Sequence, residues 1–400
     1  MRVAVLGAGY AGLTLARRLE RTLPADVELV VVDEQRDHLV QHELHRVVRR
    51  PSLADDITVD LREVLDCEVR QAEVTAVDAD AGAATLATDD GEETLSYDVG
   101  AVCLGAETAY YDLGGVREHA TPLKRLSHAR EIRDDFLELD DGDRVVVGGA
   151  GLSGVQVAGE LAALAEEEGV DVAVCLLEQE AVVAPTFPES FQRAVHDSLL
   201  DAGVTVRTGT AVTSADGDAI SLVSGEELSY DQFVWTGGIQ GPEALRDERP
   251  VVRADLRLGD ATFAVGDAAR VVDSDGEAVP ASASAAIRAA RVAADNVGTL
   301  VAHLRDDDGG FEPRLTRYRF EVPGWLVSVG DDAVAKVGPT VLTGRPALAL
   351  KTTVGAGYLG SVGAIRNATD LVREELDIAE RDAIDAVPDD IVDVSESEEE

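Results

Sequence analysis

The chain carries one pattern of hydrophobic and polar positions twice. In each copy an apolar run of strand length precedes closely spaced glycines, and a segment with helical spacing and a second apolar run follow them. These segments are Val3–Leu6, Leu13–Arg21 and Val27–Val32 in the first copy, and Arg144–Val147, Val155–Glu167 and Asp171–Leu177 in the second. Apolar runs without alternation are typical of buried parallel strands. Each copy therefore predicts a βαβ unit, and the repeat predicts an α/β fold with two such units.

The remaining segments extend this picture. Antiparallel strands are predicted over Glu68–Val77 and Ala83–Ala87, with a turn at 89–91 after them. Further buried strands are predicted over Tyr97–Cys103, Val204–Thr208, Phe233–Trp235 and Thr262–Val265. Helices are predicted over Leu126–Leu139, Phe187–Ala202 and Ser282–Leu304. Strands of a smaller C-terminal region are predicted over Leu326–Lys336 and Leu348–Thr353.

The first glycine cluster has the context of a dinucleotide-binding loop. Gly7 permits a tight turn, Gly9 lets the backbone approach a pyrophosphate, and Gly12 allows close packing of helix on strand. The N-terminus of the following helix then stabilises phosphate charge. Asp33 lies twenty-one positions after Gly12, where an acid can accept hydrogen bonds from a ribose diol.

The second cluster repeats this arrangement with Gly149, Gly151 and Gly154, and Glu178 takes the place of the acid. No Arg or Lys adjoins Glu178 to hold a 2′-phosphate, so we expect NADH to be preferred over NADPH. Two dinucleotide sites in one chain predict two cofactors that exchange electrons.

Composition excludes other classes of partner. The formal charge of −42 repels nucleic acid and anionic lipid, so no nucleic-acid partner is expected. Only three lysines occur, and this acidic, lysine-poor composition resembles that of cytosolic proteins of salt-in halophiles; an acidic mesophilic protein is the alternative. We expect no secretory leader, no disulfide and no membrane span. The expected location is therefore the cytoplasm, with at most peripheral contact with the cytoplasmic face of the cell membrane.

Several segments in order resemble the type II NADH dehydrogenases (NADH:quinone oxidoreductases), a family of two-dinucleotide flavoproteins. They are Val5–Leu13, the stretch from Asp33 to Val48 with His38 and Gln41 matching, Leu95–Asp98, Cys103–Gly105, Trp235–Gly238 and Phe263–Asp267. The resemblance implies FAD and NADH as cofactors. It places Gly105, Gly266 and Asp267 with the first loop at the flavin, and Gly238 with the second loop at NADH.

This resemblance also implies a domain plan. We expect two Rossmann-like domains of three layers (β/β/α), with the NADH-binding domain inserted in a discontinuous FAD-binding domain. The expected boundaries are 1–112 and 243–312 for the FAD-binding domain, 113–242 for the NADH-binding domain, 313–385 for a small C-terminal interface region and 386–400 for a disordered acidic tail.

The chain departs from the family on the side where the electron acceptor is expected. Ser284 and Arg288 stand where the family has two glutamines, and Gln156 stands where it has a glutamate. His42 and His45 lie in a stretch that the family fills with Pro, Leu and Tyr. These are our candidates for the acceptor face, with Gln156, Ser284 and Arg288 as the catalytic candidates; the alternative for Arg288 is a surface ion pair.

Other interpretations remain open at this point. His38, His42 and His45 at helical spacing could hold a metal, although a polar face beside the flavin explains them as well, and Lys124 is expected to be structural. The leading acceptor is a quinone. The alternatives are a soluble NADH oxidoreductase with another small acceptor, such as ferredoxin or dioxygen, and a redox sensor with little turnover. Sulfide chemistry is disfavoured, because Cys103 lacks a partner cysteine. A homodimer stays open.

Overall fold

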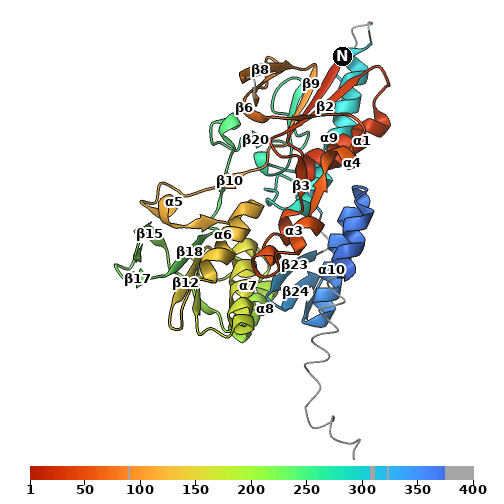
Figure 1. Ribbon diagram of the computed structural model, residues 1–400. Coiled ribbons are helices and arrows are strands. Elements are labelled where there is room, and N and C mark those ends of the chain that lie inside the picture. The colour runs from red at the N-terminus through yellow and green to blue at the C-terminus, as the bar shows by residue number, and fades with distance from the viewer. Residues whose placement is uncertain (89–90, 307–310, 322–323, 374–400) are drawn as a thin grey trace, which may run out of the picture.

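The computed structural model describes residues 1–88, 91–306, 311–321 and 324–373. Two five-stranded parallel sheets form its framework, and the predicted α/β class with two Rossmann-like units is confirmed (Figure 1). The paired apolar runs of the sequence supply the central strands of both sheets, where nearly every side chain is buried.

The first sheet takes strands from both ends of the chain. In spatial order its strands are β21 (Thr262–Ala264), β9 (Val99–Val102), β1 (Arg2–Leu6), β2 (Glu28–Asp33) and β5 (Glu68–Gln71). Helices α1 (Tyr10–Thr22) and α9 (Ala283–Leu304) pack together on one face. Alanines on the buried side of α9 allow this close approach. The other face carries an antiparallel layer of β6 (Glu73–Asp78), β7 (Ala83–Thr88) and β8 (Gly91–Ser96).

The second sheet repeats the three-layer plan with the intervening residues. Its strands are, in spatial order, β11 (Thr121–Pro122), β18 (Gln232–Trp235), β12 (Arg144–Gly148), β13 (Ala173–Leu177) and β14 (Thr205–Arg207). Its helices are α6 (Leu126–Phe136), α7 (Leu152–Glu168) and α8 (Glu189–Asp201), and its antiparallel layer is β15 (Val212–Ala215), β16 (Ala219–Leu222) and β17 (Glu227–Ser229). The chain passes between the two units twice, through β10 (Glu107–Thr108) and β19 (Ile239–Gln240), which pair antiparallel.

Short elements connect this framework. They are β3 (Asp37–Leu39), η1 (Gln41–Glu43), α2 (Arg46–Arg49), α3 (Leu53–Asp56), β4 (Thr58–Asp60), α4 (Leu61–Val64), α5 (Val116–His119), η2 (Glu243–Leu245), β20 (Val251–Val252), η3 (Gly266–Ala268) and β22 (Arg270–Val271).

The C-terminal region corrects two predictions. The strand expected over Leu326–Lys336 is a hairpin of β23 (Gly324–Val329) and β24 (Asp332–Val337), continued by β25 (Thr340–Thr343). The strand expected over Leu348–Thr353 is wrong, because these residues lie in helix α10 (Arg345–Ser361). A proline in the first turn starts this helix, and buried residues follow at helical spacing: Ala347, Lys351, Gly355, Tyr358 and Leu359.

The prediction of antiparallel strands over Glu68–Val77 is half wrong. Residues 68–71 form β5 and pair parallel with β2, whereas residues 73–78 leave that sheet as β6 and pair antiparallel with β7. The backbone N–H of Ala72, between them, donates to the carbonyl of Asp33 at the end of β2. The chain therefore changes layers at Ala72, where the sequence shows no turn signal.

The proposed domain boundaries stay a prediction, and residues 374–385 and the expected tail 386–400 lie outside the described residues. Within the described part of the chain, none of the helices combines the length and apolar character that crossing a bilayer requires.

Candidate functional site

The first glycine loop connects β1 to α1 in the conformation that its sequence demands. Gly7 has φ of +96°, in the left-handed region that favours glycine. A Cβ on Gly12 would lie 1.8 Å from the carbonyl oxygen of Gly7, so helix and loop pack backbone to backbone. Around Gly9, by contrast, a Cβ would meet no heavy atom of the described residues within 4 Å. Open space therefore adjoins the middle glycine alone.

The second loop, between β12 and α7, reproduces this geometry. Gly149 has φ of +93°, and a Cβ on Gly154 would lie 1.8 Å from the Gly149 carbonyl oxygen. Near Gly151 no heavy atom of the described chain lies within 4 Å of the Cβ position. In both loops, therefore, the middle glycine adjoins open space, whereas the first and third glycines pack against neighbouring backbone.

Both helices begin without a side-chain cap from the described residues. Gly9 and Gly151 occupy the N-cap positions of α1 and α7, and neither helix has an acidic residue in its first turn. The backbone N–H groups and the positive end of each helix dipole therefore stay available to an anion. The residues present thus fit a dinucleotide pyrophosphate at each helix start.

The two acids occupy equivalent positions. Asp33 Oδ2 accepts the backbone N–H of Ala8 at 2.6 Å, and Glu178 Oε2 accepts that of Ala150 at 2.8 Å. Burial raises the pKa of Asp33, although two backbone N–H groups oppose that rise. Each carboxylate therefore holds its glycine loop in shape, a role that the sequence analysis did not assign. Each carboxylate oxygen has a further lone pair, with which the acid can still accept a ribose hydroxyl.

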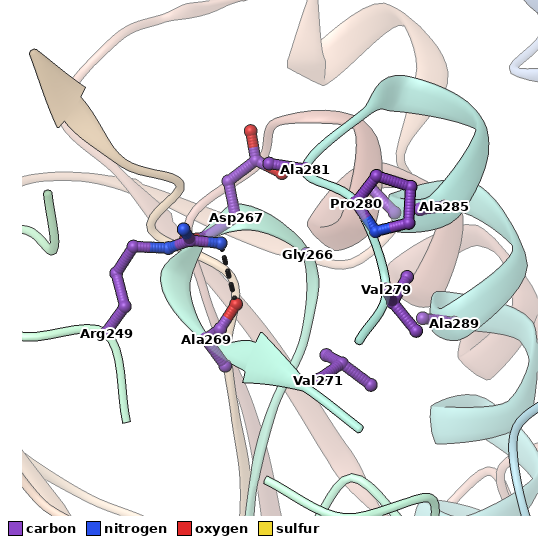
Figure 2. Close-up of a pocket in the computed structure, with 11 residues that line it drawn as sticks. Arg249, Gly266, Asp267, Ala269, Val271, Val279, Pro280, Ala281, Ala285 and Ala289 are labelled. Carbon is purple, nitrogen blue, oxygen red and sulfur yellow. Dashed lines mark hydrogen bonds between the residues drawn. The ribbon is translucent and has the colours of Figure 1, made fainter. Parts of the chain in front are cut away.

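A pocket lies between η3 and the start of α9, and Gly266 and Asp267 form part of its wall (Figure 2). Gly266 has φ of +74° and packs against Ala11 and Ala286, which brings η3 close to both helices. Arg249 donates from Nε to the carbonyl of Asp267 at 2.7 Å and from its terminal nitrogen to that of Ala269 at 3.0 Å. Figure 2 shows this guanidinium bound to the turn, with the Asp267 carboxyl beside Ala281.

The Asp267 carboxylate accepts no hydrogen bond from the part of the chain that the structure describes. Burial raises its pKa, while Lys124 and Arg249 oppose the rise. A carboxylate at a pocket wall that accepts no hydrogen bond from the described residues can accept one from a ligand hydroxyl, such as a ribityl hydroxyl of FAD.

Two other predicted glycines differ in character. Gly105, after β9, has φ of +74° and open space within 4 Å of its Cβ position, as far as the described residues show. At Gly238 a Cβ would lie 1.9 Å from the hydroxyl oxygen of Tyr111. Gly238 thus allows Tyr111 to pack closely, whereas Gly105 leaves room that a ligand can use.

The three catalytic candidates fall into two separate groups. Arg288 Nε donates to Ser284 Oγ at 3.3 Å across one turn of α9. The amide nitrogen of Gln156, on α7, lies 3.5 Å from Nε2 of His45. No hydrogen bond between the described residues joins these two groups. The acceptor face predicted from Gln156, Ser284 and Arg288 stays a prediction.

The three histidines do not lie on one helical face, so the structure does not support the alternative of a metal site at helical spacing. His38 is in β3, His42 is in η1 and His45 precedes α2, because the chain turns between them. His38 Nδ1 donates to the carbonyl of Ala8 at 3.0 Å, and its Nε2 therefore accepts from the hydroxyl of Tyr358 at 2.8 Å. Among the described residues, moreover, no group of three or more His, Cys, Asp or Glu is arranged to hold a metal ion.

A buried ionic cluster adjoins these histidines. Glu43, 1% exposed, lies 3.3 Å from Lys351 Nζ on α10 and 3.1 Å from a guanidinium nitrogen of Arg46. Lys351 also donates to Ser328 Oγ at 3.2 Å, and that hydroxyl lies 2.7 Å from His45 Nε2. The cluster therefore joins η1 and α2 to the C-terminal region.

A second ion pair extends the cluster to the unit formed by the second sheet. Glu160, on α7, accepts from Arg49 Nε at 2.8 Å, and both side chains are about 3% exposed. Burial raises the pKa of Glu160, and Arg49 opposes that rise.

Sequence reasoning missed this cluster. Its only sign in the sequence is that Lys351 is a charged residue inside an apolar run. The contact between Lys351 and Glu43 spans about three hundred residues of chain, and periodicity carries no information about such a pairing.

Comparison with known proteins shows the family of the chain. Residues 1–290 match the family model described as pyridine nucleotide-disulphide oxidoreductase. A type II NADH:quinone oxidoreductase of Staphylococcus aureus is 26% identical over 400 residues, covering 91% of this chain and 96% of the relative.

Two solved structures share the fold. The NDH2 protein of Plasmodium falciparum, in complex with NADH, superimposes with a TM-score of 0.78 at 15% identity and covers 93% of this chain and 97% of its own. The sulfide:quinone oxidoreductase of Aquifex aeolicus gives a TM-score of 0.74 at 18% identity, with 92% of each chain covered.

Proposed function

The chain belongs to the pyridine nucleotide-disulphide oxidoreductase family, and from that premise we propose that it is an FAD-dependent NADH dehydrogenase that passes two electrons on to a quinone. The observation that carries the proposal is the pair of glycine loops, each with one open glycine at an uncapped helix start. When bound, FAD supplies the chemistry of accepting a hydride and releasing two electrons.

In this proposal the first loop and Asp33 bind the adenine half of FAD. Gly105 and Gly266 leave room for the rest of the cofactor, and Asp267 accepts from a ribityl hydroxyl. NADH is bound by the second loop (Gly149, Gly151 and Gly154) and by Glu178. Gly238 is assigned to the same site, where it lets Tyr111 pack closely. Ser282, the N-cap of α9, accepts from the backbone N–H of Ala285, and this helix begins at the pocket wall, where its positive end would stabilise negative charge on a bound flavin.

Quinone is proposed as the acceptor on the strength of the Staphylococcus aureus relative, whose name states that activity. A sulfide-oxidising role is less consistent with this chain. Cys103 is 4% exposed, and burial raises the pKa of both Cys67 and Cys103 to about 12. Thiols held protonated in this way are poor nucleophiles.

The acceptor is tested by reoxidation. The protein is purified in multimolar KCl, its flavin is reduced by NADH without air, and a short-chain quinone or air is then added. Flavin reoxidation by quinone should be at least about tenfold faster than by air. Reduction by NADH followed by equal rates with quinone and air would refute quinone as the acceptor while leaving the NADH dehydrogenase intact. A soluble oxidoreductase with dioxygen as acceptor would then be the better description.

Nucleotide preference is tested at Gln179, which follows Glu178 and is exposed. Gln179→Arg introduces a cation next to the expected ribose position without disturbing the buried Glu178. The variant should raise the efficiency of NADPH relative to NADH, and an unchanged ratio would contradict the ribose assignment.

A further inference from the structure

Tyr111 lies where the chain first crosses from the unit of the first sheet to the unit of the second. It follows β10, whose antiparallel partner β19 carries the chain back, so the two crossovers run side by side (Figure 1). The carbonyl of Ala109 accepts from Trp235 Nε1 at 2.8 Å, and the backbone N–H of Ala109 donates to the carbonyl of Gly238 at 3.0 Å. These two bonds hold the first crossover against residues 235–238, and Tyr111 follows two positions later.

Tyr111 has a backbone conformation that does not suit tyrosine. The backbone N–H of Leu113 donates to the carbonyl of Tyr110 at 2.9 Å, which closes a four-residue turn. The central residues of this turn, Tyr111 and Asp112, have φ of +53° and +55°, the pattern of a type I′ turn. Asn, Asp and Gly are favoured at such positions, whereas a tyrosine is strained there. The local stability of the turn therefore does not explain why a tyrosine stands in it.

The Tyr111 side chain contacts the end of β18 and is nevertheless open to solvent. Its hydroxyl oxygen would lie 1.9 Å from a Cβ on Gly238, so the two residues are in close contact. Tyr111 is 63% exposed, which means that this contact covers only part of its ring. Strained backbone conformations are often kept where a side chain serves a ligand. An exposed ring on a strained turn therefore points to a binding role.

The segment that Tyr111 contacts belongs to the second dinucleotide site. Thr236 Oγ1 donates to the carbonyl of Gly149 at 2.9 Å. A Cβ on Gly149 would lie 2.7 Å from the Cα of Gly237. Residues 236–238 therefore pack directly beside the loop that is proposed to bind the pyrophosphate of NADH.

The strand order of the second sheet indicates which half of NADH reaches Tyr111. Strand β12 leads into the glycine loop, and its neighbours are β13 on one side and β18 on the other. Glu178, directly after β13, is the proposed partner of the adenosine ribose. A dinucleotide extends in both directions from its pyrophosphate, across the carboxyl ends of the parallel strands. The nicotinamide half therefore extends over the end of β18, where Tyr111 contacts Gly238.

We propose that the ring of Tyr111 is a binding surface for the nicotinamide riboside half of NADH. The inference rests on the proposed function and adds to it a residue that positions the reacting half of the nucleotide. The Tyr111 ring offers a flat apolar face, on which the planar nicotinamide ring can stack. Because the ring makes this contact, the hydroxyl group is dispensable for it. Because Glu178 lies on the other side of the glycine loop, the adenosine half is bound independently of Tyr111.

Two nucleotides test this contact in the oxidised, flavin-loaded protein, whose first glycine loop is occupied. NAD⁺ does not reduce the flavin and contains both halves of the nucleotide, whereas ADP lacks the nicotinamide riboside. Tyr111→Asn should weaken NAD⁺ binding, measured by isothermal titration calorimetry in KCl, at least about fivefold. This is the lower end of what the loss of an aromatic stacking partner costs a planar base. The affinity for ADP should stay within about twofold of wild type.

Tyr111→Phe is the matched control, because it keeps the ring and the strained turn and removes the hydroxyl alone. This variant should bind both NAD⁺ and ADP within about twofold of wild type. Equal weakening of NAD⁺ and ADP by Tyr111→Asn, or no weakening of either, would overturn the proposal. A loss of NAD⁺ affinity as large in Tyr111→Phe as in Tyr111→Asn would contradict a contact made by the ring.

Thermal unfolding of the flavin-loaded protein without nucleotide separates a binding role from a structural one. Asparagine is tolerated in the left-handed region, so Tyr111→Asn relieves strain in the turn. The variant should melt about 1 °C higher than wild type. A variant that melts more than about 2 °C below wild type would show that the ring supports the fold, and would count against the proposal.

The calorimetric titrations also distinguish a failure of this inference from a failure of the proposed function. A wild-type protein that binds neither NAD⁺ nor ADP would refute the second loop as an NADH site, and the role of Tyr111 with it. Wild-type binding of both nucleotides, with unchanged affinities in Tyr111→Asn, would leave that site in place and refute the role of Tyr111 alone.

Discussion

Removal of the Lys351 ammonium tests whether the buried ionic cluster holds the C-terminal region to the rest of the protein. Lys351 Nζ lies 3.3 Å from Glu43 Oε2, and the two side chains are 4% and 2% exposed. At that distance their attraction is about 5 kcal/mol with an effective dielectric constant of about 20. Breaking one side of a buried pair typically costs about 3–5 kcal/mol. Because Arg46 still pairs with Glu43, we expect about 3 kcal/mol for Lys351→Met, which preserves most of the volume.

Thermal unfolding in KCl measures this loss. An unfolding entropy of about 2.1 cal/mol/K per residue gives about 0.8 kcal/mol/K for 400 residues, so 3 kcal/mol lowers the melting temperature by about 4 °C. The exposed Arg18–Asp295 pair, 2.8 Å apart, provides the control, and Arg18→Met should cost no more than about 1 °C. The Lys351→Met deficit should persist as KCl is raised, because buried charges are screened little. Equal deficits for the two variants would refute the reasoning.

Two further predictions concern pH and cofactor retention. Burial lowers the pKa of His38 from 6.5 to about 4, so this residue contributes about 3 kcal/mol that is present above pH 6.5 and lost as the pH falls toward 4. In His38→Gln the denaturant midpoint should change less between pH 6.5 and pH 4 than it does in wild type. An unchanged pH dependence would exclude His38 as the source of this loss of stability. Arg249→Lys replaces the two nitrogens that bond the Asp267 and Ala269 carbonyls with one, which weakens this contact. Flavin should then dissociate about tenfold more readily, as followed by its fluorescence, and equal retention would contradict the role of Arg249 at the turn.

The paired glycine loops could be predicted because local sequence determines them. Gly7 and Gly149 need positive φ, Gly12 and Gly154 leave no room for a side chain, and each acid follows at the spacing that a βαβ unit imposes. The order of strands in both sheets follows from the same repeat.

Elements determined by distant contacts could not be predicted in this way. The change of layer at Ala72 depends on the end of β2, and helix α10 has an apolar run that fits a strand equally well until its buried side is known. The contact between Glu43 and Lys351 depends on tertiary structure.

The assignment of separate cofactors to the two loops is tested most directly by Gly9→Ala and Gly151→Ala. Both glycines have backbone angles that alanine can adopt, and the described residues leave space for a Cβ at each. With the cofactors removed, both variants should therefore melt within about 1 °C of cofactor-free wild type, which is less than 1 kcal/mol. The measurement is the visible flavin absorption of each purified protein during an anaerobic titration with NADH.

Wild type should carry flavin that NADH bleaches. Gly151→Ala should keep its flavin and require at least about tenfold more NADH, a loss of about 1.4 kcal/mol. Gly9→Ala should fold without flavin. A well-folded wild type without flavin, or a Gly9→Ala variant that retains as much flavin as wild type, would contradict the assignment.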